Sequence, residues 1–72
     1  MAETLTPEAV EGMVAQVKAM ADDGNNEEAH MVEDGIHTLV LAAIAAGTAE
    51  DPSDCASVAL TTREIKFSRW YA

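Results

Sequence analysis

The sequence lacks the covalent cross-links that often reinforce small domains. Cys55 is the single cysteine among 72 residues, so no disulfide can form within the chain. A chain of this length forms one domain at most and buries a modest part of its surface, so helix packing, a metal ion or an oligomer must add stability. We therefore predict one domain over residues 1–72, in which Cys55 is a small buried or half-buried filler rather than a reactive thiol.

Long apolar runs are also absent. The longest, residues 39–46, is far shorter than the roughly 20 residues that a membrane-spanning helix needs. The chain starts without the basic-then-apolar leader of secreted proteins, and a lone free thiol suits a reducing compartment. These observations predict a cytoplasmic protein that does not contact a membrane.

Basic residues are scarce: thirteen Asp and Glu face four Lys and Arg, and the net charge is -9. The phosphate backbone repels such a chain, so we expect no direct nucleic-acid binding. Acidity of this degree first of all favours solubility. A second hypothesis is that a row of carboxylates imitates DNA phosphates and binds a DNA-binding protein. Glu27, Glu28 and Asp34 form the candidate row.

Aromatic residues are equally rare, and they share residues 63–72 with most of the basic residues. The side chains concerned are Phe67, Trp70, Tyr71, Arg63, Lys66 and Arg69. A small domain rarely leaves all its aromatic surface in water, so we predict that this segment packs back on the acidic body. Arg69 or Arg63 is then expected to pair with Glu33. The rival hypothesis is an exposed peptide that binds a partner protein through Arg69 and Trp70.

Two long segments carry clear helix signals. Thr6 is a suitable N-cap and Pro7 suits the first helical position, and apolar residues then recur at three-and-four spacing. This pattern predicts a helix over residues 7–21. A second helix is predicted over residues 26–46, with Gly47 as its stop.

A shorter third helix is predicted to begin at Asp51 and Pro52, with the Asp51 side chain as its cap, and to end near Thr62. Residues 63–72 fit a strand and a helical turn equally well, and residues 1–5 are expected to form a flexible leader. The predicted fold class is all-α: a small three-helix bundle. Its first two helices form a hairpin, the third crosses them, and the C-terminal aromatic segment packs on the bundle.

The chemically most suggestive cluster lies on the second predicted helix. His30, Glu33, Asp34 and His37 are three and four residues apart, which places them along one strip about two turns long. Glu33 falls at the edge of the apolar face, where a carboxylate needs a hydrogen-bond donor. The simplest interpretation is a network of hydrogen bonds between histidines and carboxylates that seals the helix packing.

Two chemical interpretations of the cluster stay open. His30, Glu33 and His37 resemble the ligands of helical metal sites and suit zinc or manganese, although one helix alone supplies too few ligands and a dimer would have to join two copies. Alternatively, a histidine paired with a carboxylate performs acid–base catalysis. The alternative function is thus a metal-binding or metal-dependent hydrolytic protein centred on His30, Glu33, Asp34 and His37.

The order of several short motifs resembles a group of small uncharacterised proteins from actinobacteria and their phages. The matching motifs are Glu28-Ala29-His30-x-x-Glu33-Asp34-x-Ile36-His37, Val40-Leu41-x-x-Ile44-Ala45, Asp51-Pro52, Ala59-Leu60 and Phe67-x-Arg69-Trp70. The resemblance covers residues 28–71. It implies a bacterial or phage source and a role in binding or inhibiting a host protein, and it assigns no activity.

Together these observations predict a small acidic, non-catalytic protein-interaction module without a cofactor. Its expected partner-binding residues are Glu27, Glu28, Asp34, Arg69 and Trp70. We also expect a homodimer, because a chain this short with an alanine-rich second helix has little buried area per monomer, and a second copy would cover the remaining apolar arc of that helix.

Overall fold

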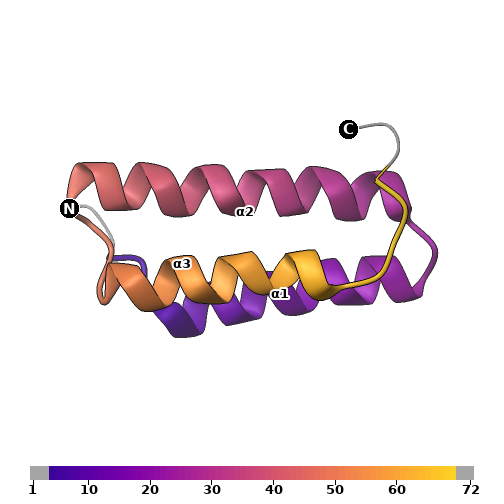
Figure 1. Ribbon diagram of the computed structural model, residues 1–72, viewed down its shortest axis with the longest axis horizontal. Coiled ribbons are helices and arrows are strands. Elements are labelled where there is room, and N and C mark those ends of the chain that lie inside the picture. The colour runs from indigo at the N-terminus through magenta and orange to yellow at the C-terminus, as the bar shows by residue number, and fades with distance from the viewer. Residues whose placement is uncertain (1–3, 70–72) are drawn as a thin grey trace.

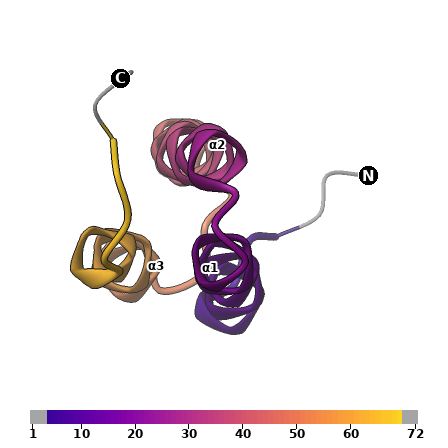
Figure 2. The same ribbon diagram turned by 90° about the vertical axis from the view of Figure 1, so that its right-hand side faces the viewer.

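The computed structural model describes residues 4–69 as a bundle of three helices and one short 3₁₀ turn. The elements are α1 (Pro7–Asp22), α2 (Asn26–Ala46), α3 (Pro52–Leu60) and η1 (Thr61–Glu64). α1 and α2 form a hairpin, and α3 returns in the direction of α1 (Figure 1). This confirms the predicted all-α three-helix bundle. Seen along its length, the bundle shows three roughly aligned helices at the corners of a triangle, so α3 runs beside the hairpin instead of crossing it as predicted (Figure 2).

Local signals explain most helix ends. The Thr6 hydroxyl accepts a hydrogen bond from the Ala9 amide at 3.2 Å, and Gly47 ends α2 in the left-handed conformation with φ 75°. The predicted side-chain cap of α3 is wrong. Asp51 has φ 48°, and its side chain makes no capping hydrogen bond within residues 4–69. Side-chain capping needs an extended backbone at the cap residue, and the left-handed conformation of Asp51 does not provide it.

Small apolar side chains from all three helices make the core. Its members are Val10, Val17, Ala29, Ile36, Val40, Ala43, Cys55 and Ala59. Cys55 is fully buried, as predicted, and its thiol donates to the Glu50 carbonyl at 3.2 Å. Burial raises the pKa of the Cys55 thiol, and nearby carboxylates, Asp51 foremost, raise it further. A core whose fully buried side chains are mostly Val, Ala and Cys buries little apolar area, so each of its contacts matters to stability.

The start of the chain is held at one end of the bundle. The Leu5 amide donates to the Thr48 carbonyl at 2.9 Å, and the Glu50 amide donates to the Leu5 carbonyl at 2.7 Å. Leu5 is therefore paired with the connection between α2 and α3, which corrects the prediction of a flexible leader for this residue. Residues 1–3 of that leader lie outside the described residues.

The C-terminal segment turns back at the opposite end of the bundle. After η1 the chain rises from α3 towards the first half of α2 (Figures 1 and 2), and Ile65 and Phe67 pack against the core. This confirms the predicted packing for the segment up to Arg69, whereas Trp70 and Tyr71 lie outside the described residues. No helix within residues 4–69 combines the length and the apolar character needed to cross a membrane.

Candidate functional site

The centre of the candidate site is a carboxylate inside the bundle. Glu33 lies on the inner side of α2 and is only 3% exposed, because Ile36 and Val40 follow on the same side one and two turns later and are buried with it. The sequence placed Glu33 at the margin of the apolar face, and the fold buries it fully. A carboxylate in such a position stays charged only if a donor is held beside it.

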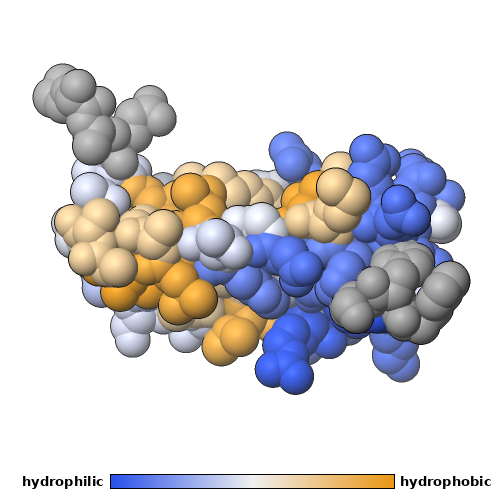
Figure 3. Space-filling model, turned by 90° about the horizontal axis from the view of Figure 1, so that it is seen from above, coloured by the Kyte–Doolittle hydropathy of each residue, from blue (hydrophilic) through white to orange (hydrophobic). Residues whose placement is uncertain are grey.

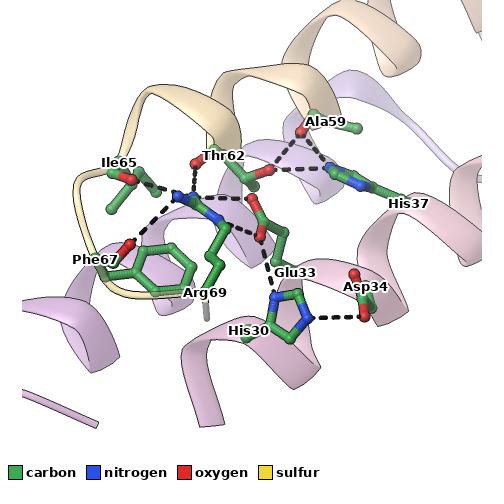
Figure 4. Close-up of polar contacts among 9 residues, drawn as sticks. All are labelled: His30, Glu33, Asp34, His37, Ala59, Thr62, Ile65, Phe67 and Arg69. Atoms are coloured by element: carbon green, nitrogen blue, oxygen red, sulfur yellow. Dashed lines mark hydrogen bonds and ion pairs between the residues drawn. The ribbon is translucent and has the colours of Figure 1, made fainter. Parts of the chain in front are cut away.

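Arg69 of the C-terminal segment supplies that donor (Figure 4). Its Nε donates to Glu33 Oε1 at 2.7 Å and its Nη2 to Glu33 Oε2 at 3.1 Å, which confirms one of the two predicted ion pairs. The same Nη2 lies 2.9 Å from the Thr62 carbonyl and 3.1 Å from the Ile65 carbonyl. The Thr62 carbonyl also accepts from the Ile65 amide at 3.0 Å, and the charged guanidinium is a second donor to it, so one side chain joins α2 to the end of η1.

The other side of the Arg69 guanidinium is covered by Phe67. The guanidinium carbon lies 3.8 Å from the centroid of the Phe67 ring, a cation–π contact. Nη1 is also 3.5 Å from the Phe67 carbonyl, a long hydrogen bond. Arg69 is therefore held from two sides, and it adds a polar link to the apolar packing of Ile65 and Phe67 that holds residues 65–69 on the bundle.

These contacts set the protonation of Glu33. Burial by itself raises the pKa of the Glu33 carboxyl, but the hydrogen bonds and positive charge of Arg69, with smaller contributions from Thr62 and His37, outweigh it. The net result is a pKa below the ordinary value of a glutamate. Glu33 is thus ionised at neutral pH, and the pair acts as a charged link in the bundle.

His37 turns away from Glu33 towards α3 (Figure 4). Its Nε2 lies 2.9 Å from the Thr62 hydroxyl and 3.1 Å from the Ala59 carbonyl, and the Thr62 hydroxyl donates to the same carbonyl at 3.1 Å. With the proton on Nε2, His37 donates and every one of these groups has a partner. The sequence analysis missed Thr62, which is fully buried. Its spacing from Cys55 and Ala59 continues the buried stripe of α3 and is the signal that would have identified it.

His30 lies between two carboxylates of its own helix. Its Nδ1 is 3.6 Å from Glu33 Oε1, and its Nε2 is 3.3 Å from Asp34 Oδ2. Asp34 points outwards with an exposed side chain, so the strip that the spacing predicted extends from the core to solvent. The structure thus places His30, Glu33 and Asp34 together and sends His37 to a different neighbour.

Two of the three predicted metal ligands, Glu33 and His37, are engaged in hydrogen bonds with other protein groups. Both Glu33 oxygens accept from Arg69, and His37 Nε2 is bound to α3. Within residues 4–69, no group of three or more His, Cys, Asp and Glu side chains converges on one point. A metal held by His30, Glu33 and His37 would have to displace Arg69, and such a site stays a prediction.

Thermal unfolding tests the metal site directly. A ligand that binds the folded chain raises the melting temperature, by an amount that grows with its concentration. Because Glu33 and His37 are bound to Arg69 and Thr62, we expect the same melting temperature with zinc, with manganese and with chelator. A rise with either ion that disappears in His30→Ala and Glu33→Gln would establish the metal site instead.

Two hollows lie beside this network, between α2 and the α3–η1 segment. An open one of about 400 Å³ is lined by Glu33, His37, Leu60, Arg63 and Arg69. The second, of about 250 Å³, has a mostly apolar lining of His37, Val40, Leu41, Ala56, Ala59 and Leu60. His37 and Leu60 border both, so the polar site opens directly onto an apolar groove.

The outer surface of α2 has two contrasting halves (Figure 3). Towards the N-terminus of the helix it is mostly hydrophilic and exposes Glu27, Glu28 and Asp34, three of the predicted partner-binding residues, with Met31, 64% exposed, among them. Towards the C-terminus it is apolar, and Leu41 is 68% exposed. We call the following exposed residues the apolar patch: Leu41, Ala42, Ile44 and Ala45 of α2 with Leu60 of α3.

The other two predicted partner-binding residues, Arg69 and Trp70, are not part of this exposed surface as described. The guanidinium of Arg69 is turned inwards to Glu33 and to backbone carbonyls, and Trp70 lies outside the described residues.

Family models, curated proteins and solved structures gave no match to this chain. The resemblance to actinobacterial and phage proteins therefore stays a prediction.

Proposed function

We propose that this chain is a non-catalytic protein-interaction module that binds other proteins through the outer surface of α2. The observation that carries the proposal is the exposed apolar patch on a chain with a net charge of -9. Exposed apolar surface of this kind is characteristic of sites where another macromolecule docks. Leu41 and Leu60, 68% and 55% exposed, line the same groove and form its most prominent part.

The sequence of the second half of α2, which carries most of the patch, supports this proposal. Residues 38–49 contain no charged side chain, so the second half of α2 is apolar or small on every side. A helix that is apolar all round is ordinarily covered on all sides. α1 and α3 cover the side that carries Val40 and Ala43, and the patch is the part left over.

The acidic half of α2 adds selectivity. Glu27, Glu28 and Asp34 are exposed near the N-terminal half of the helix. Rows of carboxylates attract a basic surface and repel an acidic one, which favours a basic partner such as a DNA-binding protein. If the resemblance to phage proteins holds, that partner is a protein of the bacterial host.

The polar network supports a structural role in place of catalysis. Glu33 is bound by Arg69, and His37 is bound by Thr62 and Ala59. Their contacts hold α2, α3 and the C-terminal segment together. The two groups best placed to act as acid or base are thus engaged in fixing the fold that presents the outer surface of α2.

The test compares two charge-neutralised triple variants. The partner is first isolated from cells that naturally produce this chain and identified, and its Kd is then measured with purified components. Glu27→Gln/Glu28→Gln/Asp34→Asn should weaken binding about tenfold at low salt and lower the salt dependence, because exposed charge pairs contribute up to about 1 kcal/mol each. Equal affinity of this variant and wild type would exclude the acidic half as a binding surface.

The matched control neutralises the same number of carboxylates elsewhere. Glu8→Gln/Glu11→Gln/Asp23→Asn changes exposed residues of α1 and of the turn that follows it. It alters the net charge by the same amount, so it should leave the Kd nearly unchanged. A loss equal to that of the α2 variant would mean that net charge, not the surface of α2, determines binding.

A further inference from the structure

We propose that the apolar patch binds the same patch of a second copy, so that two α2 helices pack antiparallel in a symmetric dimer. The inference rests on the proposed function in one respect, namely that the patch is a binding surface. It goes further by naming the occupant and its orientation. The acidic halves of α2 then remain free at the two ends of the dimer.

Electrostatics favour a second copy in this place. Two chains of net charge -9 repel each other wherever their carboxylates meet. All of the patch except Leu60 lies within residues 38–49, which carry no charge, so an equally acidic copy meets fewer carboxylates there than on the rest of the surface. A strongly basic partner, in contrast, gains nothing from charge at this surface and would prefer the acidic half.

The same reasoning fixes the orientation. In an antiparallel pair centred between Thr38 and Ala42, the two Glu27 side chains lie about 20 Å from the centre on opposite sides, at about 1.5 Å per residue. Their separation of about 40 Å is several times the screening length at physiological salt. A parallel pair would set the rows Glu27, Glu28 and Asp34 of both copies side by side.

The outer side of α2 suits close approach of another helix. Ala42 and Ala45 are exposed there and small, and Gly35 lies two turns before Ala42 on the same side. A Cβ added at Gly35 would meet no heavy atom of the described residues within 4 Å, so packing within the chain does not require glycine here. Leu41, Ile44 and Leu60 border this strip towards α3, and Leu39, 43% exposed, borders it towards α1.

The area needed is compatible with the size of the molecule. A stable interface buries at least about 1,200 Å², or about 600 Å² from each copy. The chain exposes 4709 Å², so the dimer would cover about an eighth of it. A core made of small side chains gives a monomer of this length little apolar burial, which a symmetric interface increases for both copies at once.

The mass of the full chain in solution tests the proposal. Sedimentation equilibrium from low to high micromolar concentration should show a species of twice 7.6 kDa. Leu41→Asp should raise the dimer Kd at least 100-fold while circular dichroism stays helical, because it places two like charges in an apolar interface. Ala19→Asp, which adds the same charge on exposed α1 surface, should leave the dimer intact.

A pair of glycine variants tests whether this side of α2 is the contact surface. Gly12 in α1 and Gly35 in α2 are both exposed within helices, and neither has a heavy atom of the described residues near its would-be Cβ. Alanine should therefore raise the thermal stability of the monomer equally at both. Only Gly35→Ala should weaken the dimer, by about tenfold. If Leu41→Asp fails to fold, this pair decides the question.

Two results would overturn the proposal. Wild type that stays at the mass of a monomer at high micromolar concentration excludes the dimer. A dimer that persists in Leu41→Asp and Gly35→Ala uses another surface. Neither result affects the partner measurements with the acidic triple variant, so failure of the dimer can be told apart from failure of the proposed function.

Discussion

Replacing Arg69 by alanine should lower the free energy of unfolding by about 3 kcal/mol at neutral pH. The variant leaves Glu33, which is 3% exposed, as a buried carboxylate without its donor. Removing one partner of a buried ion pair costs about 3–5 kcal/mol, and the lower end applies because the Arg69 side chain is 30% exposed. The Ile65 carbonyl loses the Arg69 donor as well, and the Thr62 carbonyl keeps only its bond from the Ile65 amide. Urea unfolding measures the loss.

Two further variants show whether the loss comes from the pair. Lys66→Ala removes an exposed basic residue from the same segment and should change stability by less than about 0.5 kcal/mol. Glu33→Gln in the Arg69→Ala background should recover part of the lost stability, because a neutral amide is less costly to bury than a charge. Strictly additive effects of the two substitutions would show that Glu33 and Arg69 are not coupled.

The effect of Arg69→Ala should also depend on pH. The folded-state pKa of Glu33 lies below its value in the unfolded chain, so the pair stabilises fully above the unfolded pKa of about 4.3. This stabilisation is lost as the pH falls through the folded-state pKa. Wild type and variant should therefore differ most near neutral pH and converge only as the pH falls through the lowered folded-state pKa of Glu33. A constant difference from neutral to acidic pH would contradict this account of the pair.

Ile36→Ala should also destabilise the fold by about 3 kcal/mol, whereas Leu41→Ala should change it by less than about 0.5 kcal/mol. Both residues belong to α2, but Ile36 is 3% exposed in the core and Leu41 is 68% exposed in the apolar patch. The small side chains around Ile36 cannot fill the cavity that its truncation leaves. The comparison is made by urea unfolding at concentrations low enough to keep the chain monomeric.

This pair of variants tests which side of α2 faces the bundle. Similar losses at both positions would mean that Leu41 is packed inside and that the apolar patch does not exist. The proposed dimer depends on the same distinction, since Leu41 supplies a large part of its contact surface. The unfolding data and the mass measurements therefore examine one surface by two independent routes.

Two polar links, one of them the buried pair of Glu33 and Arg69, hold α2 on the bundle. Arg69 draws residues 65–69 onto α2, and His37 and Thr62 join the middle of α2 to the end of α3. Both links lie on the side of α2 that faces the bundle. They hold the helix from one side and leave its opposite side, with the acidic row and the apolar patch, open to partners.

Local signals in the sequence determined where the helices lie. Thr6 and Pro7 start α1, and Gly47 stops α2, because capping and backbone preference act over a few residues. The pairing of Glu33 with Arg69 was predictable for a related reason. A carboxylate at the edge of an apolar face needs a donor, and most of the few basic residues are in residues 63–72.

Only the tertiary structure decided which side of the uncharged second half of α2 is covered and which is free. Residues 38–49 are apolar or small on every side, so charge does not mark the covered side, and the structure buries Val40 while it leaves Leu39 and Leu41 on either side of it exposed. The tertiary structure also directs His37 towards Thr62 and gives Asp51 a left-handed backbone. These features depend on contacts between residues far apart in the chain, or on how two helices must be joined, and the order of neighbouring residues does not encode them.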